Sequence, residues 1–403
     1  MPAETTPLAA VGIIPKESPA KVHKNEHQLT IGLPKEISNQ EKRVAITPES
    51  VGLLTNNGIQ VVVESGVGLS AKFSDQDYSD AGAKVSYSRK EVFAAEVVLK
   101  VDPPSIEEIG FMTQGSCLIS ALQLGRQNKE FIEALNEKKI TATAFEYLED
   151  KVGGMPVVRA MSEIAGSTVM LIASEYLSSV NDGKGLIMGG VTGVPPTQVV
   201  IIGSGTVAEY AARTALGLGA SIKVFDNHIY KLRRLKQLLG QQIYTSTIDN
   251  FSLNQALSEA DVVIGALREE KGRNKIVVSE EMVANMMHGS IIIDVSIDQG
   301  GCIETSRMTT HEDPIYSVYD IIHYCVPNIA SRVARTASYS LSNIFTPIIL
   351  QMADLRGAEE MIFNYKWFLR GVYTYRGSLT NAHLGRKFGL NHKELQLLLA
   401  ARY

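Results

Sequence analysis

A glycine-rich loop carries the clearest chemical pattern in the sequence. Residues 203–208 read Gly-Ser-Gly-Thr-Val-Ala and match G-x-G-x-x-G/A, in which the first glycine permits a tight turn and the second lets the backbone approach a pyrophosphate. A β-branched apolar run precedes the loop, and an Ala/Leu-rich stretch with helical pattern follows it to Leu218. Free N–H groups at a helix start hold phosphates. The pattern therefore predicts a dinucleotide site formed by Gly203, Ser204, Gly205, Thr206 and Val207.

An acidic residue extends this pattern. Asp226 ends a second predicted strand and lies 21 residues beyond Gly205. At this position a carboxylate accepts hydrogen bonds from both hydroxyl groups of the adenosine ribose, and it repels a 2′-phosphate. The sequence therefore predicts NAD, and not NADP, as the cofactor.

Two further strand ends are candidates for the same site. In open α/β sheets, ligands bind beyond the carboxyl ends of the strands. Asp298 follows a predicted strand over 290–295, which makes it a candidate for chemistry, although an acid there also suits the capping of a loop. Ala266 and Leu267 end a predicted strand over 262–267 and are candidate cofactor contacts.

Length and composition bound the class of protein. A chain of 403 residues exceeds one ordinary core and favours two domains. The net charge of −4 gives no reason to expect nucleic acid or an anionic membrane as partner. The three cysteines lack CxxC spacing, so the sequence indicates neither a disulfide framework nor a metal site. The N-terminus lacks a signal-peptide core, and we expect a cytoplasmic protein.

Predicted strands alternate with helices, which indicates a parallel α/β architecture. Two longer helices are predicted over 161–180 and 338–354, the first with small residues that permit close packing. The first 28 residues show no sustained period and are expected to form a loosely attached arm. The remaining predicted strands before the first long helix cover 29–33, 59–64, 97–101, 116–122 and 141–147.

From about Leu29 to near its end, the chain resembles alanine dehydrogenase and the related soluble nucleotide-binding portion of proton-translocating transhydrogenase. The block over 294–343 favours the dehydrogenase branch. The motifs that carry the resemblance are GLPKE (32–36), NQEKRVAITP (39–48), ESGVGLSAKFSDQDYSDAGA (64–83), LKV (99–101), MSEIAG (161–166), MGGVTGVPP (188–196), the glycine loop, DVSIDQGGCIETSRMTTHEDP (294–314), HYCVPNIASRVARTASYSLSN (323–343) and YRGSLTN (375–381).

The resemblance implies a two-domain α/β fold, in which a central Rossmann NAD-binding domain is inserted in a discontinuous α/β substrate domain, with the ligands in the cleft between them. The implied segments are an arm (1–28), the substrate domain (29–156 and 335–403) and the NAD-binding domain (157–334). The implied reaction is the oxidation of L-alanine by NAD and water to pyruvate, ammonium and NADH. Its partners would be a small amino acid or 2-oxo acid, with no nucleic acid or membrane, and the family forms homo-oligomers, dimers or hexamers.

The resemblance also implies roles for single residues. Arg43 would clamp the substrate carboxylate, and Asp298 would stand near the nicotinamide. Met161 and Ser162 would line the nicotinamide side and its phosphates. The adenosine ribose would contact Lys231, and Asn328 would order the backbone near the nicotinamide. From the residue types alone, Arg43 also suits a surface ion pair, Met161 a core position and Lys231 a solvated helix face.

Two positions depart from the family pattern. After LKV the family carries a lysine that binds the substrate carbonyl, and this chain has Asp102. The next strand carries the family's catalytic histidine, and the corresponding residue here is Gln123. Positioned acid–base groups contribute about 10²–10⁴-fold each, so the replacements bear directly on catalysis.

Other residues are candidates to compensate for these replacements. Lys100 shares a strand face with Asp102, and Arg159 stands where the family usually has a small residue. The alternatives to alanine dehydrogenase are therefore a dehydrogenase for another amino acid, such as one with an extra cation, a transhydrogenase-like hydride carrier, and an inactive NAD(H)-binding protein.

Overall fold

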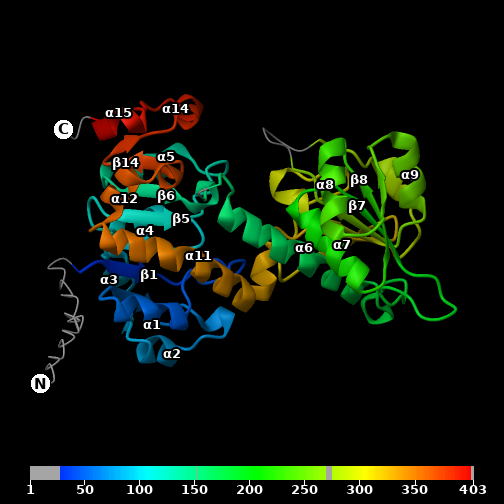
Figure 1. Cartoon of the computed structure of the whole chain (residues 1–403), viewed down its shortest axis with the longest axis horizontal. Coiled ribbons are helices and arrows are strands. Elements are labelled where there is room, and N and C mark those ends of the chain that lie inside the picture. Colours follow the sequence, from blue (N-terminus) through cyan, green and yellow to red (C-terminus); the bar gives the residue numbers. More distant parts are fainter. Residues whose placement is uncertain (1–27, 151, 269–274, 401–403) are drawn as a thin grey trace, which may run out of the picture.

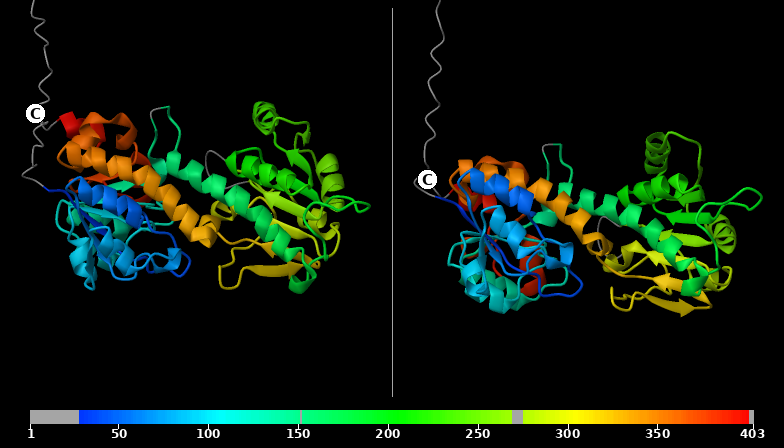
Figure 2. Two further views of the ribbon diagram at one scale, coloured as in Figure 1. Left: turned by 60° about the horizontal axis from the view of Figure 1, so that its bottom comes forward. Right: turned by 90° about the horizontal axis from the view of Figure 1, so that it is seen from below.

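The computed structural model describes residues 28–150, 152–268 and 275–400. Two α/β lobes lie side by side and are joined by two long helices, α6 (Pro156–Tyr176) and α11 (Ala334–Asp354) (Figure 1). The same two-lobed arrangement is seen from two further directions (Figure 2). The predicted N-terminal arm lies, except for Gln28, outside the described residues.

The first lobe is built from both ends of the chain around an eight-stranded sheet. Its strand order is β15-β14-β6-β5-β4-β1-β2-β3. The pairs among β1 to β6 are parallel, whereas β14 pairs antiparallel with β6 and with β15. The strands are β1 (Thr30–Leu33), β2 (Gln60–Glu64), β3 (Lys84–Ser86), β4 (Val97–Leu99), β5 (Cys117–Ser120), β6 (Thr141–Ala144), β14 (Val372–Tyr375) and β15 (Ser378–Leu379).

Helices cover this first sheet. The helix α11 packs an apolar face on it, including the fully buried Leu341 and Phe345. The other helices of the lobe are α1 (Pro48–Asn56), α2 (Asp75–Asp80), α3 (Arg89–Phe93), α4 (Ile106–Phe111), α5 (Lys129–Glu137), α12 (Ala358–Asn364), α13 (Lys366–Leu369), α14 (Ala382–Phe388) and α15 (Leu395–Ala400).

The second lobe holds a seven-stranded sheet in the order β12-β13-β11-β10-β7-β8-β9. All its strand pairs are parallel except the edge pair of β12 with β13. Leaving β12 aside, the order is that of the doubly wound dinucleotide-binding fold, with a switch point between β7 and β10. The elements are β7 (Gln198–Ile202), α7 (Thr206–Gly217), β8 (Ser221–Phe225), α8 (Ile229–Leu239), β9 (Tyr244–Ser246), α9 (Asn250–Ser258), β10 (Val262–Gly265), α10 (Glu280–Ala284), β11 (Ile291–Asp294), β12 (Ile315–Val318) and β13 (Ile321–Tyr324).

Small residues on α6 allow it to lie close against α7. A Cβ atom added at Gly166 would come within 2.4 Å of the Val207 carbonyl oxygen, so only glycine fits there. By length and composition alone, α6 is also apolar enough to cross a membrane. Part of its apolar surface packs in the core of the second lobe, where Val169 and Ala173 are fully buried.

The structure corrects several sequence-based boundaries. The strand predicted over 141–147 ends at Ala144 and continues as a 3-10 turn, Phe145–Tyr147, which places the Phe145 ring 5.3 Å from that of Phe345 on α11. The first long helix begins at Pro156, not at residue 161, because proline is favourable in the first turn. The antiparallel strands β12, β14 and β15 were not predicted, since they are short and two of them are formed by the distant C-terminal segment.

Candidate active site

The glycine loop lies at the switch point of the second sheet. Gly203 adopts a φ of 111°, and its N–H donates to the Phe225 carbonyl at 2.7 Å. An added Cβ would lie 2.5 Å from the Ala266 carbonyl oxygen, so this turn requires glycine. At Gly205, by contrast, an added Cβ would meet no described protein atom within 4 Å. The open space beside Gly205, at the start of α7, is what a pyrophosphate needs in order to reach the backbone.

Asp226 lies directly beside the loop, at the end of β8. The Ser204 hydroxyl donates to its Oδ2 at 2.6 Å, and the His228 N–H donates to its Oδ1 at 2.8 Å. Burial by itself would raise the pKa of Asp226, but these hydrogen bonds outweigh it and hold the pKa below its usual value. The carboxylate is therefore fixed and ionised, as an acceptor for ribose hydroxyls must be.

The other predicted cofactor residues come from five elements. Thr206 and Val207 form the first turn of α7, and Lys231 lies on α8. The Ala266 N–H donates to the Ile202 carbonyl at 2.8 Å, which keeps the end of β10 against the end of β7. The remaining members are Leu267 after β10, Met161 and Ser162 on α6, and Asn328 before the 3-10 turn Ile329–Val333.

The first sheet has a switch point of its own, between β1 and β4. Glu36, just after β1, accepts the N–H of Val101 at 2.7 Å and that of Asp102 at 3.3 Å, and it forms an ion pair with Lys100. Burial outweighs this pairing and raises the pKa of Glu36 to about 7. Glu36 therefore fixes the backbone that presents Asp102.

Lys100 does not reach the cleft as a free cation. Its side chain is 2% exposed, and its ammonium group is bound by Glu36. This pairing corrects the expectation that Lys100 could take over from the missing family lysine. The ammonium group of a buried, paired lysine is bound by its partner and is not available to bind a substrate.

Arg43 is bound in bidentate fashion by a carboxylate from its own loop. Its Nε donates to Glu41 Oε1 at 2.7 Å and its Nη2 to Oε2 at 2.5 Å. Asn328 donates from its side-chain amide to the same Oε2 at 2.8 Å. Burial alone would raise the pKa of Glu41, but Arg43 and Asn328 hold it below its usual value. Glu41 therefore connects the predicted substrate clamp of one domain with a predicted cofactor residue of the other.

Serine hydroxyls secure the backbone on both sides of Arg43. The Lys42 N–H donates to Ser331 Oγ at 2.8 Å, and the Val44 N–H donates to Ser338 Oγ at 2.9 Å. One turn further along α11, Ser342 Oγ accepts the Thr47 N–H at 3.0 Å. The serines of the motif SYSLSN thus hold a loop that is nearly 300 positions away in the sequence.

Asp102 and Gln123 contact each other across the ends of β4 and β5. The Gln123 side-chain amide donates to Asp102 Oδ1 at 3.3 Å. Gln123 itself has a φ of 46°, and its N–H donates to Glu146 at 2.9 Å. Burial, and then the charge of Glu41, raise the pKa of Asp102. The two positions that depart from the family pattern therefore form one hydrogen-bonded pair.

Asp298 lies on a 3-10 turn, Val295–Gln299, directly after β11. Its side chain is reached by water, yet the surrounding protein displaces enough solvent to raise the pKa of its carboxyl. The positive charges of Arg126 and Arg268 act in the opposite direction on the same pKa. Because Arg126 belongs to the first lobe, its charge acts on Asp298 from the other side of the boundary between the lobes.

Arg159 is not part of this group. It lies exposed on α6, where its Nε donates to Glu163 at 3.2 Å one turn along the helix. The expectation that it supplies displaced positive charge to the substrate is therefore not supported by its contacts. Such an exposed pair contributes only about 0.3–0.5 kcal/mol to stability.

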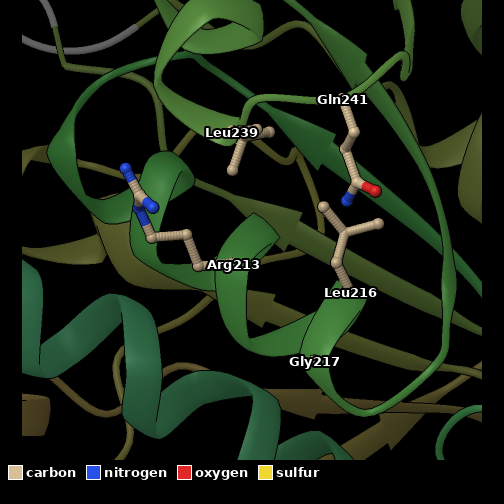
Figure 3. Close-up of a pocket in the computed structure, with 5 residues that line it drawn as sticks. All are labelled: Arg213, Leu216, Gly217, Leu239 and Gln241. Carbon is tan, nitrogen blue, oxygen red and sulfur yellow. The ribbon is translucent and has the colours of Figure 1, made fainter.

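A shallow pocket of about 360 Å³ lies elsewhere on the second lobe (Figure 3). It is at the C-terminal end of α7, whereas the glycine loop is at the N-terminal end of that helix. We therefore do not assign it to the active site. It is lined by Arg213, Leu216, Gly217, Leu239 and Gln241.

Comparison with known proteins agrees with this geometry. Residues 32–165 match the family described as alanine dehydrogenase/PNT, N-terminal domain, and residues 169–382 match alanine dehydrogenase/PNT, C-terminal domain. The chain belongs to the alanine dehydrogenase/PNT family. An alanine dehydrogenase of Methanococcus maripaludis is 39% identical over 87% of this chain and 94% of its own length. One from Bacillus subtilis is 37% identical over 90% and 96%. A solved structure of L-alanine dehydrogenase has 35% identity and a TM-score of 0.84, covering 90% of this chain and 99% of its own.

Membership of the alanine dehydrogenase/PNT family confirms the predicted fold class, a Rossmann domain inserted in a discontinuous α/β domain. It also confirms that the chain is an oxidoreductase that uses NAD. The exact domain boundaries and the roles of the single residues stay predictions.

Sequence reasoning missed several residues that the fold brings into the site. Glu41 lies two positions before Arg43, a spacing that permits an ion pair in an extended loop. Three of the others act on residues that are distant in the sequence, and the fourth, His228, contacts Asp226 two positions away without a motif that marks it. They are Glu36, Arg126, Glu146 and His228.

Proposed function

We propose that the protein catalyses the NAD-dependent oxidative deamination of L-alanine to pyruvate and ammonium, and the reverse reaction. The observation that carries the proposal is the Glu41 carboxylate, which binds both Arg43 of the substrate domain and Asn328 of the NAD-binding domain. Hydride transfer requires substrate and dinucleotide to be aligned in one cleft, and Glu41 joins the residues that we assign to the two ligands. The names of the relatives support alanine as the substrate.

The residues around Gly205 fit the dinucleotide. We assign the pyrophosphate to the open space at the start of α7 and the adenosine ribose to Asp226. When bound, NAD supplies the acceptor for the hydride that leaves the substrate Cα. Met161, Ser162 and Asn328 are assigned to the nicotinamide side.

The protein side chains would handle the carboxylate and the protons. We assign Arg43 to the substrate carboxylate, through the edge of its guanidinium that Glu41 leaves open. Asp102 is proposed as the proton acceptor in place of the family histidine, because its raised pKa brings it closer to the working range of a general base. Gln123 would orient that carboxylate, and Asp298 would face the reacting amine or water.

The pair formed by Asp102 and Gln123 also favours a second class of substrate. A carboxylate at this position would attract an amino acid with an extra cation, such as lysine or arginine. The shared names of the relatives favour alanine over this alternative, over a hydride carrier and over an inactive protein.

The test is NADH oxidation in the presence of pyruvate and ammonium. We expect saturable turnover, near the 10 s⁻¹ that is about the median for enzymes. Turnover at about a thousandth of that value with tight NADH binding would contradict the proposal. Greater activity on lysine or arginine than on alanine would show that the protein is a dehydrogenase for basic amino acids.

We also propose a homo-oligomer, a dimer or hexamer, in the cytoplasm. Apolar side chains stay exposed after α6, at Val180, Ile187, Val191 and Val194, and a second copy of the chain would cover them. Light scattering after gel filtration would measure the assembly, and a monomer at micromolar concentration would contradict this part of the proposal.

A further inference from the structure

The cations assigned to the substrate side are already bound by carboxyl groups. Lys100 is bound by Glu36, and both donor groups on one edge of Arg43 are bound by Glu41. Asp102 adds a carboxylate where the sequence comparison predicts a lysine. An amino acid or 2-oxo acid brings a carboxylate of its own, and an anion enters a partly buried site only when a cation offsets its charge. The site therefore needs a positive charge from another residue.

Arg126 has such a charge available. It lies exposed in the connection between β5 and α5, and among the described residues its guanidinium has no hydrogen-bond or ion-pair partner. Its backbone is nevertheless fixed, because its N–H donates to the Gln123 carbonyl at 2.8 Å. The side chain of Gln127 closes the same turn with a 3.0 Å hydrogen bond to the Leu122 carbonyl. A fixed backbone with a free guanidinium is suited to receiving a ligand.

The turn that holds Arg126 lies next to the predicted catalytic residues in the sequence and in space. It begins at Gln123, whose side chain contacts Asp102. The charge of Arg126 acts on the pKa of Asp102 in its own lobe and on that of Asp298 in the other lobe. The Arg126 backbone is therefore bonded to the residue that contacts Asp102, and its charge also acts on Asp298 of the other lobe.

We infer that Arg126 binds the carboxylate of the substrate and supplies the positive charge that Asp102 has removed from this cleft. A guanidinium can form two parallel hydrogen bonds to a carboxylate, which would also orient the substrate Cα. Arg43 then acts as the second donor on the opposite edge. The inference rests on the proposed function, because it assumes a 2-oxo acid or amino acid as ligand.

Steady-state kinetics of two Arg126 variants test the inference. We expect Arg126→Gln to raise the KM for pyruvate about 10- to 100-fold, the range of a charge-assisted hydrogen bond, with little change in the Kd for NADH. Arg126→Lys should recover part of the loss, because it restores the charge without the fork. Arg213→Gln, which removes an exposed arginine at the far end of α7, should leave the KM unchanged. An unchanged KM for pyruvate in Arg126→Gln would overturn the inference.

A binding experiment separates this inference from the proposed function. Oxamate, an unreactive analogue of a 2-oxo acid, is titrated into the complex of the full-length protein with NADH, and NADH fluorescence reports binding. If the wild type does not turn over pyruvate but binds oxamate, and Arg126→Gln loses that binding, the function fails and the role of Arg126 stands. Turnover of pyruvate with equal oxamate binding in both proteins would leave the function standing and refute the role of Arg126. A wild type that neither binds oxamate nor turns over pyruvate would refute both.

Discussion

Asn328 donates a hydrogen bond to Glu41 across the domain boundary, at 2.8 Å. Asn328 adopts a φ of 59°, a left-handed conformation that asparagine tolerates better than most residues. The backbone at this position therefore aims an amide at the carboxylate that holds Arg43. Asn328 and Arg43 therefore share one carboxylate, and a shift of Asn328 would move a partner of the substrate clamp.

Replacing Asn328 separates the hydrogen bond from the backbone conformation. Asn328→Gly keeps the left-handed conformation and removes the amide, so we expect kcat/KM for pyruvate to fall about 10- to 100-fold with little loss of stability. Asn328→Ala should lose the same activity and also about 1 kcal/mol of stability, from the positive φ. Kinetics and urea denaturation measure the two effects. Wild-type kinetics in Asn328→Gly would show that the link to Glu41 has no catalytic role.

The raised pKa of Asp102 predicts a pH dependence of alanine oxidation. A general base must be ionised, so kcat/KM should fall as the pH drops through the pKa of Asp102, which lies above the usual value of about 3.9 for aspartate. Asp102→Asn should lower the rate about 10²–10⁴-fold and remove this acidic limb from the profile. The same limb in the variant would assign it to a different group, such as Asp298.

Glu36 predicts a pH dependence of stability. Its pKa is about 7 in the folded protein, against 4.5 when unperturbed, so between these values the folded state binds more protons than the unfolded state. Stability therefore falls as the pH rises through this window, by up to about 3 kcal/mol. Chemical denaturation of the wild type and of Glu36→Gln at pH 4.5 to 8 measures the difference. Glu36→Gln removes the group that titrates, so its curve should lack this fall. Parallel curves would contradict the raised pKa.

Replacement by alanine should have different effects at the two glycines of the phosphate loop. At Gly205 an added Cβ meets no described protein atom within 4 Å, so Gly205→Ala should fold normally and lose about 10- to 100-fold in NADH affinity by occupying the ligand's space. Gly203→Ala should instead lose at least about 1–3 kcal/mol of stability, because of its positive φ and the nearby Ala266 carbonyl. Gly217→Ala is the control, because Gly217 lies at the C-terminal end of α7, away from the loop, and an added Cβ there has no close contacts. Thermal unfolding and NADH fluorescence titration measure both effects, and equal NADH affinity in Gly205→Ala and the control would place the pyrophosphate elsewhere.

The second domain was largely predictable because its signals are local. A buried strand, a glycine loop, a helix and a terminal acid follow one another between Val199 and Asp226, and each acts on its neighbours in the chain. Dinucleotide binding follows from such a contiguous pattern. In the first lobe, by contrast, the predicted end of the strand over 141–147 was less accurate. There the strand ends at Ala144, and Phe145 contacts Phe345 on a helix that is distant in the sequence.

The substrate side depended on the tertiary structure. The sequence by itself determined the family, the cofactor and the replacement of two family residues by Asp102 and Gln123. It did not determine that Lys100 is paired with Glu36, that Glu41 joins Arg43 to Asn328, or that Arg126 acts on acids of both lobes. These contacts form where the carboxyl ends of parallel strands meet and where two domains face each other. Their energies depend on distance and burial in space, and separation along the chain does not reveal either quantity.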